Sequence, residues 1–229
     1  MTDRPGFQRA YSAQHKTQRA NDLMEAAREL ATREGVRGVT LTAIAQHAGV
    51  HVSAVRRYYA SREEILLLLA EEGYEDWSRA VAGRLTGRTG LTSAELARVL
   101  VATLVERPLL CDLFTHVTLS LEREVGYERV RDFKRAAGRA AGVVAQAIAA
   151  TGTLGPVPAE EFVVAVIALT APLWQAGHPG ETVTRLYQED PGTAHMGVDF
   201  EATLTWLLTA LCDGLTGARN SLEVGGRQA

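Results

Sequence analysis

Apolar positions along the chain recur every three or four residues, which is the spacing of one face of an α-helix. The first clear stripe contains Leu23, Ala27 and Leu30. Gly35 follows it and is suited to ending a helix. No segment shows the sustained alternation that a half-buried strand requires. The sequence therefore predicts an all-α fold, with helices at about residues 18–34, 40–48, 52–59, 62–85, 92–105, 108–121, 127–149, 158–174, 182–187 and 199–217.

The stretch from Thr40 to Tyr59, TLTAIAQHAGVHVSAVRRYY, contains two short helical segments around a glycine. Thr40 can cap the first segment, because its hydroxyl can accept a hydrogen bond from a free backbone N–H. Gly49 stands where a left-handed residue would end that segment. The outward side of the second segment carries serine, arginine and tyrosine and no acid. This layout is typical of a DNA-binding helix-turn-helix, and the alternative is a helical corner of an ordinary bundle.

A long helix is expected directly after this stretch. Ser61 and Glu64 have the spacing of a capping box, in which the serine caps the helix and the glutamate reaches back. The helix over residues 62–85 would link the helix-turn-helix to the rest of the chain. Further on, Gly138 and Gly142 lie inside a helix rich in alanine. They favour a close crossing with another helix, and a cavity beside the thin section is the alternative.

Length and composition limit the class of protein. The 229 residues are enough for a sizeable core, and every run of 18 residues contains a charge or a glycine, so we expect no membrane-spanning helix. The polar first 16 residues lack the apolar core of a signal peptide. Cys111 and Cys212 lack metal-ligand spacing, which predicts buried, reduced thiols. Together these features predict a cytoplasmic protein.

Charge is unevenly distributed along the chain. Residues 1–60 contain nine Lys or Arg against five Asp or Glu, whereas residues 61–229 contain 15 against 22. This asymmetry indicates that only the N-terminal part contacts a polyanion, although so few charges can also be uneven by chance. No nucleophile elbow, HExxH zinc-protease, phosphate-loop or CxxC motif is present among the residues of the sequence. We therefore predict no enzyme activity, no metal and no cofactor.

Residues 18–77 resemble the TetR family of transcriptional regulators. The resemblance rests on the helix ending at Gly35, on Thr40, on the IA-x-x-AGV turn of residues 44–50, on the aromatic pair 58–59 and on the Arg-Glu start of the next helix. The segments LWQAGHP (173–179) and DFEATLTWLLTALCDGL (199–215) resemble the regulatory domain more weakly. Arg56 stands where the family usually has tyrosine.

The resemblance implies an all-helical homodimer in which each subunit presents one recognition helix to the major groove of a palindromic operator. It further implies that a small effector binds the larger domain and releases the DNA, as expected of a repressor. The domain organisation predicted here is a flexible N-terminal arm (1–16), a helix-turn-helix domain (17–62, with the motif at about 40–59) and a ligand-binding and dimerisation domain (63–229).

Roles in DNA binding can be assigned by analogy and side-chain chemistry. Hydroxyl and guanidinium groups suit phosphate oxygens, and arginine is the commonest reader of guanine. Tyr59 is expected to pack inward. The predicted phosphate contacts are Thr40, Arg57, Tyr58 and Arg62, and the predicted base contacts are His51, Val52, Ser53 and Arg56, with Thr42 and Gln46 as secondary candidates.

The effector pocket and the dimer interface are predicted from apolar residues of the larger domain. The scarcity of interior charge favours a largely hydrophobic effector with a few polar groups. Each pocket candidate is also a plain core candidate. The predicted pocket comprises Trp77, Leu104, Phe114, His116, Phe133, Phe162, Leu169, Trp174 and His178. The predicted interface comprises Phe162, Val166, Leu173, Leu204, Leu208, Leu211 and Leu215.

Two alternative functions remain open. One is an effector-independent DNA-binding protein built on the same fold. The other is a helical hydrophobe-binding module without a DNA function. DNA binding separates the second alternative from the rest, and ligand-induced stabilisation separates the first.

Overall fold

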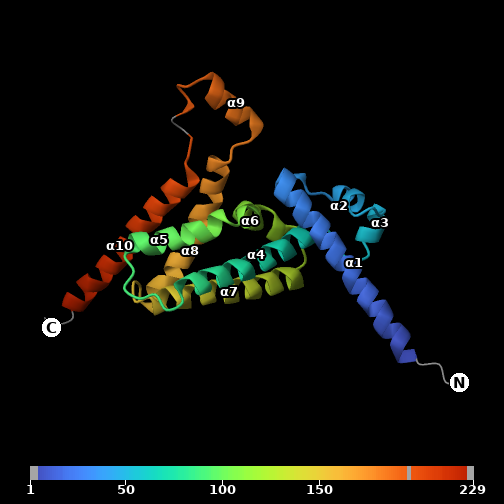
Figure 1. Ribbon diagram of the computed structural model, residues 1–229, viewed down its shortest axis with the longest axis horizontal. Coiled ribbons are helices and arrows are strands. Elements are labelled where there is room, and N and C mark those ends of the chain that lie inside the picture. The colour runs from blue at the N-terminus through green and yellow to red at the C-terminus, as the bar shows by residue number, and fades with distance from the viewer. Residues whose placement is uncertain (1–4, 195–196, 226–229) are drawn as a thin grey trace.

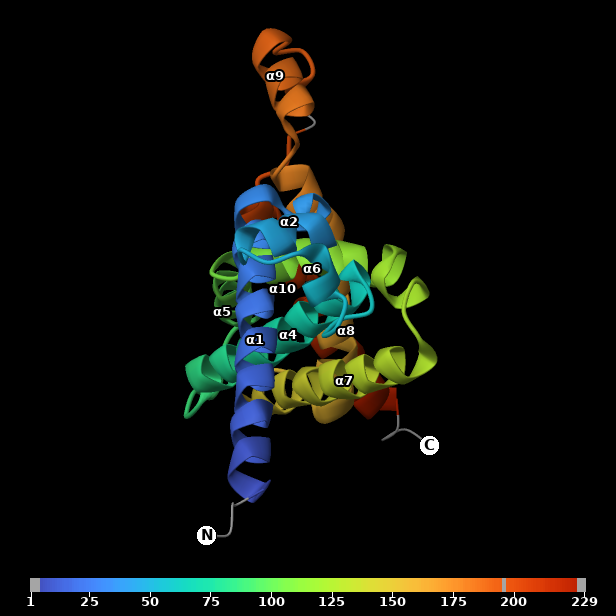
Figure 2. The ribbon, with the colours of Figure 1, turned by 90° about the vertical axis from the view of Figure 1, so that its right-hand side faces the viewer.

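The N-terminal unit of the protein is made of α1 (Pro5–Glu34), the 3-10 turn η1 (Val36–Gly38), α2 (Leu41–His47) and α3 (Val52–Val55). The structure is a computed structural model that describes residues 5–194 and 197–225, with side chains described over 15–194 and 197–217. In Figures 1 and 2, α1 crosses one end of the molecule, and α2 and α3 lie beside it. Helix α1 contacts η1 and α2.

The larger unit is a helical bundle. It consists of α4 (Arg62–Leu85), α5 (Ser93–Val105), α6 (Pro108–Leu119), the short turn η2 (Leu121–Arg123), α7 (Tyr127–Ala150), α8 (Pro156–Gly177), α9 (Glu181–Glu189) and α10 (Phe200–Gly225). Helices α4 and α7 run side by side, and α8 and α10 pack against each other. No strand occurs in the described parts of the chain, so the all-α prediction is confirmed.

Helix α1 begins earlier than the sequence pattern predicts. Its backbone is helical from Pro5, not from residue 18, so most of the segment predicted as an arm is part of a helix. Residues 1–4 of that arm lie outside the described residues. Proline is favourable in the first turn of a helix, and the following residues are mostly good helix formers. A polar helix without an apolar stripe gives no periodic signal, which explains the missed start.

Helix α4 connects the two units. Its N-cap is Ser61, whose Oγ accepts a hydrogen bond from the Glu64 N–H at 3.1 Å. Glu64 Oε2 accepts from the Ala60 N–H at 2.6 Å. The glutamate therefore reaches back one residue further than the predicted capping box requires. The helix ends at Leu85 as predicted, with Trp77 and Leu85 buried on the way.

The glycines of α7 do not serve a close crossing within this chain. A Cβ added at Gly138 or Gly142 would meet nothing within 4 Å. The buried side of α7 is formed by Phe133, Val144 and Ile148. The predicted crossing at these glycines is therefore wrong for contacts within the described chain, because they face away from the bundle.

Helix α8 is, among the described residues, long and apolar enough by composition to cross a membrane. This differs from the sequence prediction of no spanning helix. The core helix of a soluble protein can have the same length and apolar composition. Helix α8 packs against α6, α7 and α10, which is the position of a bundle helix.

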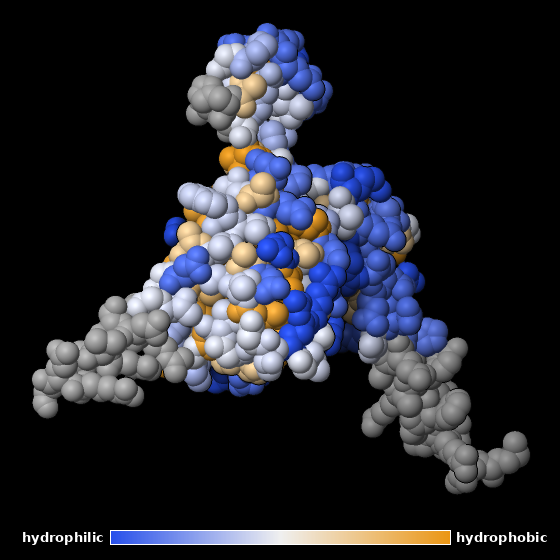
Figure 3. All heavy atoms as spheres, turned by 60° about the vertical axis from the view of Figure 1, so that its left-hand side comes forward, coloured by the Kyte–Doolittle hydropathy of each residue, from blue (hydrophilic) through white to orange (hydrophobic). Residues whose placement is uncertain are grey.

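Helix α9 projects from the bundle on a narrow neck, as the ribbon and space-filling views show (Figures 1 and 3). The neck is held by aromatic contacts. Trp174 stacks on His178 with ring centroids 3.7 Å apart, and Phe200 meets Trp174 edge-on at 5.1 Å. On α9 itself, Val183 and Leu186 are exposed.

Candidate functional site

The turn between α2 and α3 has the geometry that the sequence predicts. Thr40 Oγ1 caps α2 by accepting a hydrogen bond from the Ala43 N–H at 3.0 Å. Gly49 has φ 64°, a left-handed value that favours glycine. The Gly49 N–H donates to Gln46 O at 3.2 Å and the Val50 N–H to Ala45 O at 2.9 Å. This is the Schellman arrangement, and it fixes the direction in which α3 leaves α2.

Helix α3 is shorter than the predicted 52–59. Regular α-helix covers Val52–Val55. After it, the Arg57 N–H donates to Ala54 O at 3.2 Å and the Tyr58 N–H donates to Val55 O at 2.9 Å. These bonds join residues three apart, as in a 3-10 turn. The helical path of the backbone therefore continues to Tyr58 as a tighter, 3-10-like turn.

Val55 lies on the side of this helical segment that faces the core. It is fully buried, so the residues on either side of it point outward. Arg56 and Arg57 are exposed, and neither guanidinium has a hydrogen-bond or ion-pair partner within the described residues. Two unpaired cations on a short turn are free to bind an anionic partner.

His51 has a structural role besides any contact with DNA. Its Nδ1 lies 3.3 Å from the Ser53 backbone N and 2.9 Å from Ser53 Oγ. The imidazole is thus the N-cap of α3. Both residues are exposed, and they lie at the start of α3.

The structure brings most of the predicted DNA contacts together on the surface of one small unit. The exposed members are Thr40, Thr42, Gln46, His51, Ser53, Arg56 and Arg57, and the partly exposed members are Val52 and Tyr58. Tyr59 packs inward as predicted, and its hydroxyl donates to Ala20 O at 3.0 Å. Burial, together with Glu64 and Glu72, raises the pKa of Tyr59.

Arg62 differs from the other predicted contacts. Its guanidinium donates to Val36 O at 2.8 Å and also to Val39 O, and it pairs with Glu63 at 3.1 Å. These bonds tie the first turn of α4 to the backbone just before α2. They use three of the five guanidinium N–H donors, so Arg62 has a structural role, and its predicted phosphate contact stays a prediction.

Arg37 was missed by the sequence analysis. It lies on η1, directly before α2, is exposed, and has no hydrogen-bond or ion-pair partner among the residues that the structure describes. The available signal was a basic residue in the short loop between Gly35 and Gly38. It adds a further free cation, beside Arg56 and Arg57, to the N-terminal unit.

Five of the predicted pocket residues form the packed core instead. Trp77 is fully buried, and its Nε1–H donates to Thr103 Oγ1 at 3.0 Å. The ring of Phe114 lies 6.2 Å from that of Trp77. In this structure Trp77, Leu104, Phe114, Phe133 and Phe162 are therefore core residues, and Leu169 packs against the same core. Their part in an effector pocket stays a prediction.

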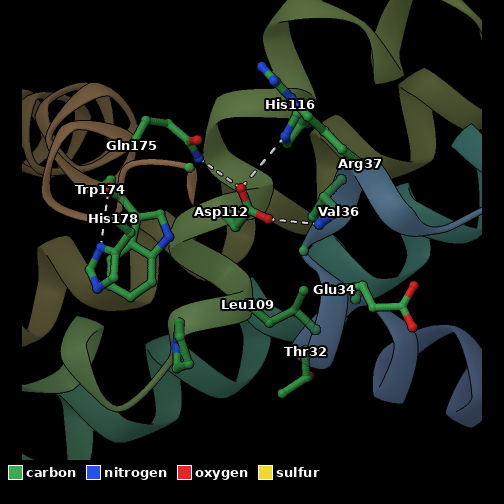
Figure 4. Close-up of a pocket in the computed structure, with 14 residues that line it drawn as sticks. Thr32, Glu34, Val36, Arg37, Leu109, Asp112, His116, Trp174, Gln175 and His178 are labelled. Atoms are coloured by element: carbon green, nitrogen blue, oxygen red, sulfur yellow. Dashed lines mark hydrogen bonds and ion pairs between the residues drawn. The ribbon is translucent and has the colours of Figure 1, made fainter. Parts of the chain in front are cut away.

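The other three predicted pocket residues line a cavity of about 340 Å³, called here the junction cavity. Its walls come from the end of α1 with η1, from α6, and from the end of α8 (Figure 4). His116, Trp174 and His178 belong to it, as predicted. Glu34, Leu109 and Asp112 also line it and were missed.

Asp112 joins the three walls of the junction cavity. Its Oδ2 accepts from the Val36 N–H at 2.8 Å and its Oδ1 from Gln175 Nε2 at 2.8 Å, as Figure 4 shows. His116 Nε2 lies 3.6 Å from the same Oδ1. Burial alone raises the pKa of this carboxyl, but the hydrogen bonds from His116, Val36 and Gln175 more than offset it, so the pKa lies below its ordinary value.

A second groove, of about 560 Å³, runs between α1, α4 and the start of α6. Most of its charged residues belong to ion pairs, Glu75 being the exception among the described lining residues. Arg28 pairs with Glu72, and Arg107 Nε lies 2.8 Å from Asp76 Oδ2. These pairs also hold α1 and α6 against α4.

The predicted dimer interface needs a correction. Phe162, Val166, Leu204 and Leu208 have no exposed surface in the single chain, so they pack in its core and cannot contact a second copy. Leu173, Leu211 and Leu215 are partly exposed. On the same helices, Val164 and Trp206 are 67% and 69% exposed. Val164 and Trp206 thus leave apolar surface exposed on α8 and α10 beside the predicted residues.

The cysteines match their prediction. Cys111 and Cys212 are buried free thiols, and burial raises the pKa of the Cys111 thiol to about 12. Among the described residues no group of three His, Cys, Asp or Glu side chains could hold a metal ion.

Comparison with known families decides the class of the protein. Residues 23–69 match the family of bacterial regulatory proteins called tetR, and residues 71–219 match the tetracyclin repressor-like C-terminal domain. The chain belongs to the TetR family. It is a DNA-binding transcription regulator with a helix-turn-helix domain and a helical C-terminal domain. The predicted boundary at 62/63 stays a prediction, since α4 continues through both units.

Solved structures share this TetR-family fold at low sequence identity. The multidrug binding protein EbrR, complexed with imidazole, is 21% identical with a TM-score of 0.53, over 84% of this chain and 94% of that chain. The fatty acid degradation regulator FadR from Bacillus halodurans is 14% identical with a TM-score of 0.54, over 86% and 95%. The MbdR regulator from Azoarcus sp. CIB is 19% identical with a TM-score of 0.52, over 82% and 96%.

No curated protein matches the chain in sequence. TetR-family regulators bind DNA and small molecules, typically as dimers, and they are generally not enzymes. They are soluble and typically cytoplasmic. These are properties of the family that the chain joins.

Proposed function

We propose that this regulator is a repressor that binds a palindromic operator as a homodimer. The observation that carries the proposal is the pair Arg56 and Arg57, exposed and unpaired on a turn whose direction is fixed by the Gly49 motif. Arg56 reads a base edge and Arg57 binds phosphate, because guanidinium groups suit both. Thr40 and Tyr58 bind the flanking phosphates.

The dimer forms through α8 and α10. Val164 and Trp206 are large apolar residues left exposed on these two helices. Covering them with the same face of a second copy removes apolar surface from water. A two-fold dimer then presents two recognition segments to matching half-sites, which explains the expected palindrome.

A small, largely hydrophobic effector bound in the C-terminal domain releases the DNA. EbrR, which shares the fold, is a multidrug binding protein. An effector that prefers a state with misplaced recognition segments must lower DNA affinity, and DNA must lower effector affinity by the same factor. Helix α4 and the Asp112–Val36 bond are the physical links through which this shift passes.

The test is a footprint on the DNA upstream of the protein's own coding region. Repression predicts protection of an inverted repeat whose half-sites lie about one helical turn apart or more. Shuffled DNA of equal length is the control for non-specific binding. If the protein binds neither the upstream DNA nor the shuffled DNA, the proposal is wrong and a hydrophobe-binding module is favoured. Specific binding that no ligand alters favours an effector-independent DNA-binding protein.

A further inference from the structure

The junction cavity is the place where a bound molecule would touch both units of the protein at once. Thr32, Glu34 and Val36 come from the N-terminal unit, whereas Asp112 and Trp174 come from the bundle. Figure 4 shows these side chains around one opening. A ligand there contacts the turn that leads into α2 directly, without a change in the bundle core.

The charge facing the cavity is predominantly negative. Asp112 is the more buried of the two lining carboxylates, with 18% of its side chain exposed against 44% for Glu34. Glu34 lines the rim and pairs with Arg33, whose guanidinium donates to it at 2.7 Å. Arg37 is the only basic side chain of fixed charge among the described lining residues, and it is exposed at the rim. The Asp112 carboxylate would therefore repel an anion that enters the cavity, so the cavity disfavours anionic ligands.

The rest of the lining combines apolar and aromatic side chains with the polar groups of Thr32, His116 and Gln175. Trp174 and His178, stacked on each other, form one wall, and Leu109 lies across from them. Aromatic faces attract cations within about 6 Å of the ring centroid. A site with one carboxylate, one tryptophan and aliphatic walls suits a molecule with a positive group and a flat apolar body.

We propose that the junction cavity binds a small organic cation with an aromatic body, and that this ligand is the effector. The positive group faces Asp112, and the aromatic body lies between Trp174 and Leu109. The proposal rests on the proposed function for its regulatory meaning, but the binding site itself stands on the cavity alone.

Binding at Asp112 changes the contact between the two units. The Val36 N–H donates to Asp112 Oδ2, and a cation that pairs with this carboxylate competes with that bond. Val36 lies in η1, four residues before the cap of α2. Weakening the bond frees η1 to move with α2 and α3, so the ligand and the DNA favour different positions of the recognition segment.

The larger groove between α1 and α4 is a poorer candidate. Most of its charges already pair with one another, as in the Arg107–Asp76 bridge. Glu75 is the one lining acid without an ion pair among the described residues, and it is exposed to water, which weakens its attraction for a cation. The junction cavity differs because no Lys or Arg pairs with Asp112 among the described residues.

The probe for the test is benzyltrimethylammonium, and 2-methyl-1-phenylpropan-2-ol is its neutral analogue of similar shape. Binding of both is measured by isothermal titration calorimetry on the full chain. The variant is Asp112→Asn, which removes the charge but keeps an acceptor for Val36. The matched control is Glu160→Gln, because Glu160 is an exposed acid on α8 outside the cavity.

The cation should bind wild type and the Glu160→Gln variant with the same affinity. Wild type should bind the alcohol about tenfold or more weakly than the cation, and the Asp112→Asn variant should bind the cation about tenfold or more weakly than wild type does. The cation should also lower the affinity of wild type for its own upstream DNA. Equal binding of cation and alcohol, or unchanged binding by Asp112→Asn, overturns the cation site. Cation binding without an effect on DNA overturns the effector role alone. Failure to bind any DNA counts against the proposed function and leaves the cavity result standing.

Discussion

Asp112 on α6 accepts a hydrogen bond from the backbone N–H of Val36 at 2.8 Å, across 76 positions of sequence. Val36 is fully buried, so water cannot replace this acceptor. The bond therefore joins the DNA-binding unit to the regulatory bundle, and the fold needs it to satisfy the buried Val36 N–H.

Removing this acceptor should weaken the fold. Asp112→Ala leaves the buried Val36 N–H unsatisfied, which costs about 1–3 kcal/mol in the free energy of unfolding. Asp112→Asn keeps an oxygen acceptor and should cost less. Urea unfolding of the two variants beside wild type measures the difference, and equal losses would show that the Val36 bond does not matter.

The same carboxylate predicts a pH dependence. The pKa of Asp112 in the folded protein lies below its ordinary value of 3.8. A lowered pKa stabilises the fold fully above the unfolded value and loses that stabilisation as pH falls through the folded value. The free energy of unfolding of wild type relative to Asp112→Asn should thus be constant above about pH 5 and fall below about pH 4. A difference that stays constant through the acid range would contradict this.

Gly35 and Gly138 should respond oppositely to alanine. Gly35 has φ 74° and ψ 164°, a conformation open essentially to glycine alone. Gly35→Ala should cost about 1–3 kcal/mol. Gly138 lies in α7 with open space around it, so Gly138→Ala should stabilise by about 0.4–1 kcal/mol. Thermal unfolding compares them, and a gain at both positions would mean that Gly35 carries no strain.

How much of this could be read from the sequence depends on the range of the interaction. The Thr40 cap and the Gly49 turn depend on residues two to five positions away, and both were predicted correctly. The junction cavity needs α1, α6 and α8 to meet, and local patterns carry no information on that meeting. Asp112 and Glu34 were therefore missed, whereas His116 and Trp174 were found as aromatic candidates.

Apolar periodicity has a second limit. The apolar pattern indicates which residues become buried, but it does not indicate whether the same chain or a second copy covers them. Phe162 and Leu204 are covered by the same chain, whereas Val164 and Trp206 stay exposed. The interface prediction erred because a strong apolar stripe was assigned to a second copy.

The dimer proposal can be tested at Trp206. Trp206→Asp places a charge on the exposed face of α10 and should shift the protein from dimer to monomer in sedimentation velocity. Tyr127→Asp is the control, because Tyr127 is 76% exposed on α7, away from α8 and α10. A Trp206→Asp protein that remains dimeric, or a wild type that is monomeric at all concentrations, would place the interface elsewhere.

DNA binding through the turn after α3 is the central claim, and one measurement addresses it directly. Fluorescence anisotropy with the upstream DNA compares wild type, the double variant Arg56→Ala/Arg57→Ala and the charge-matched double variant Arg135→Ala/Arg139→Ala on α7, whose arginines are exposed. The account predicts a loss of about 30-fold or more for the first variant, since the base contact of Arg56 contributes about 1–3 kcal/mol and the phosphate contact of Arg57 adds to it. It predicts wild-type affinity for the second. Wild-type affinity of the Arg56/Arg57 variant, or an equal loss from both variants, would contradict it.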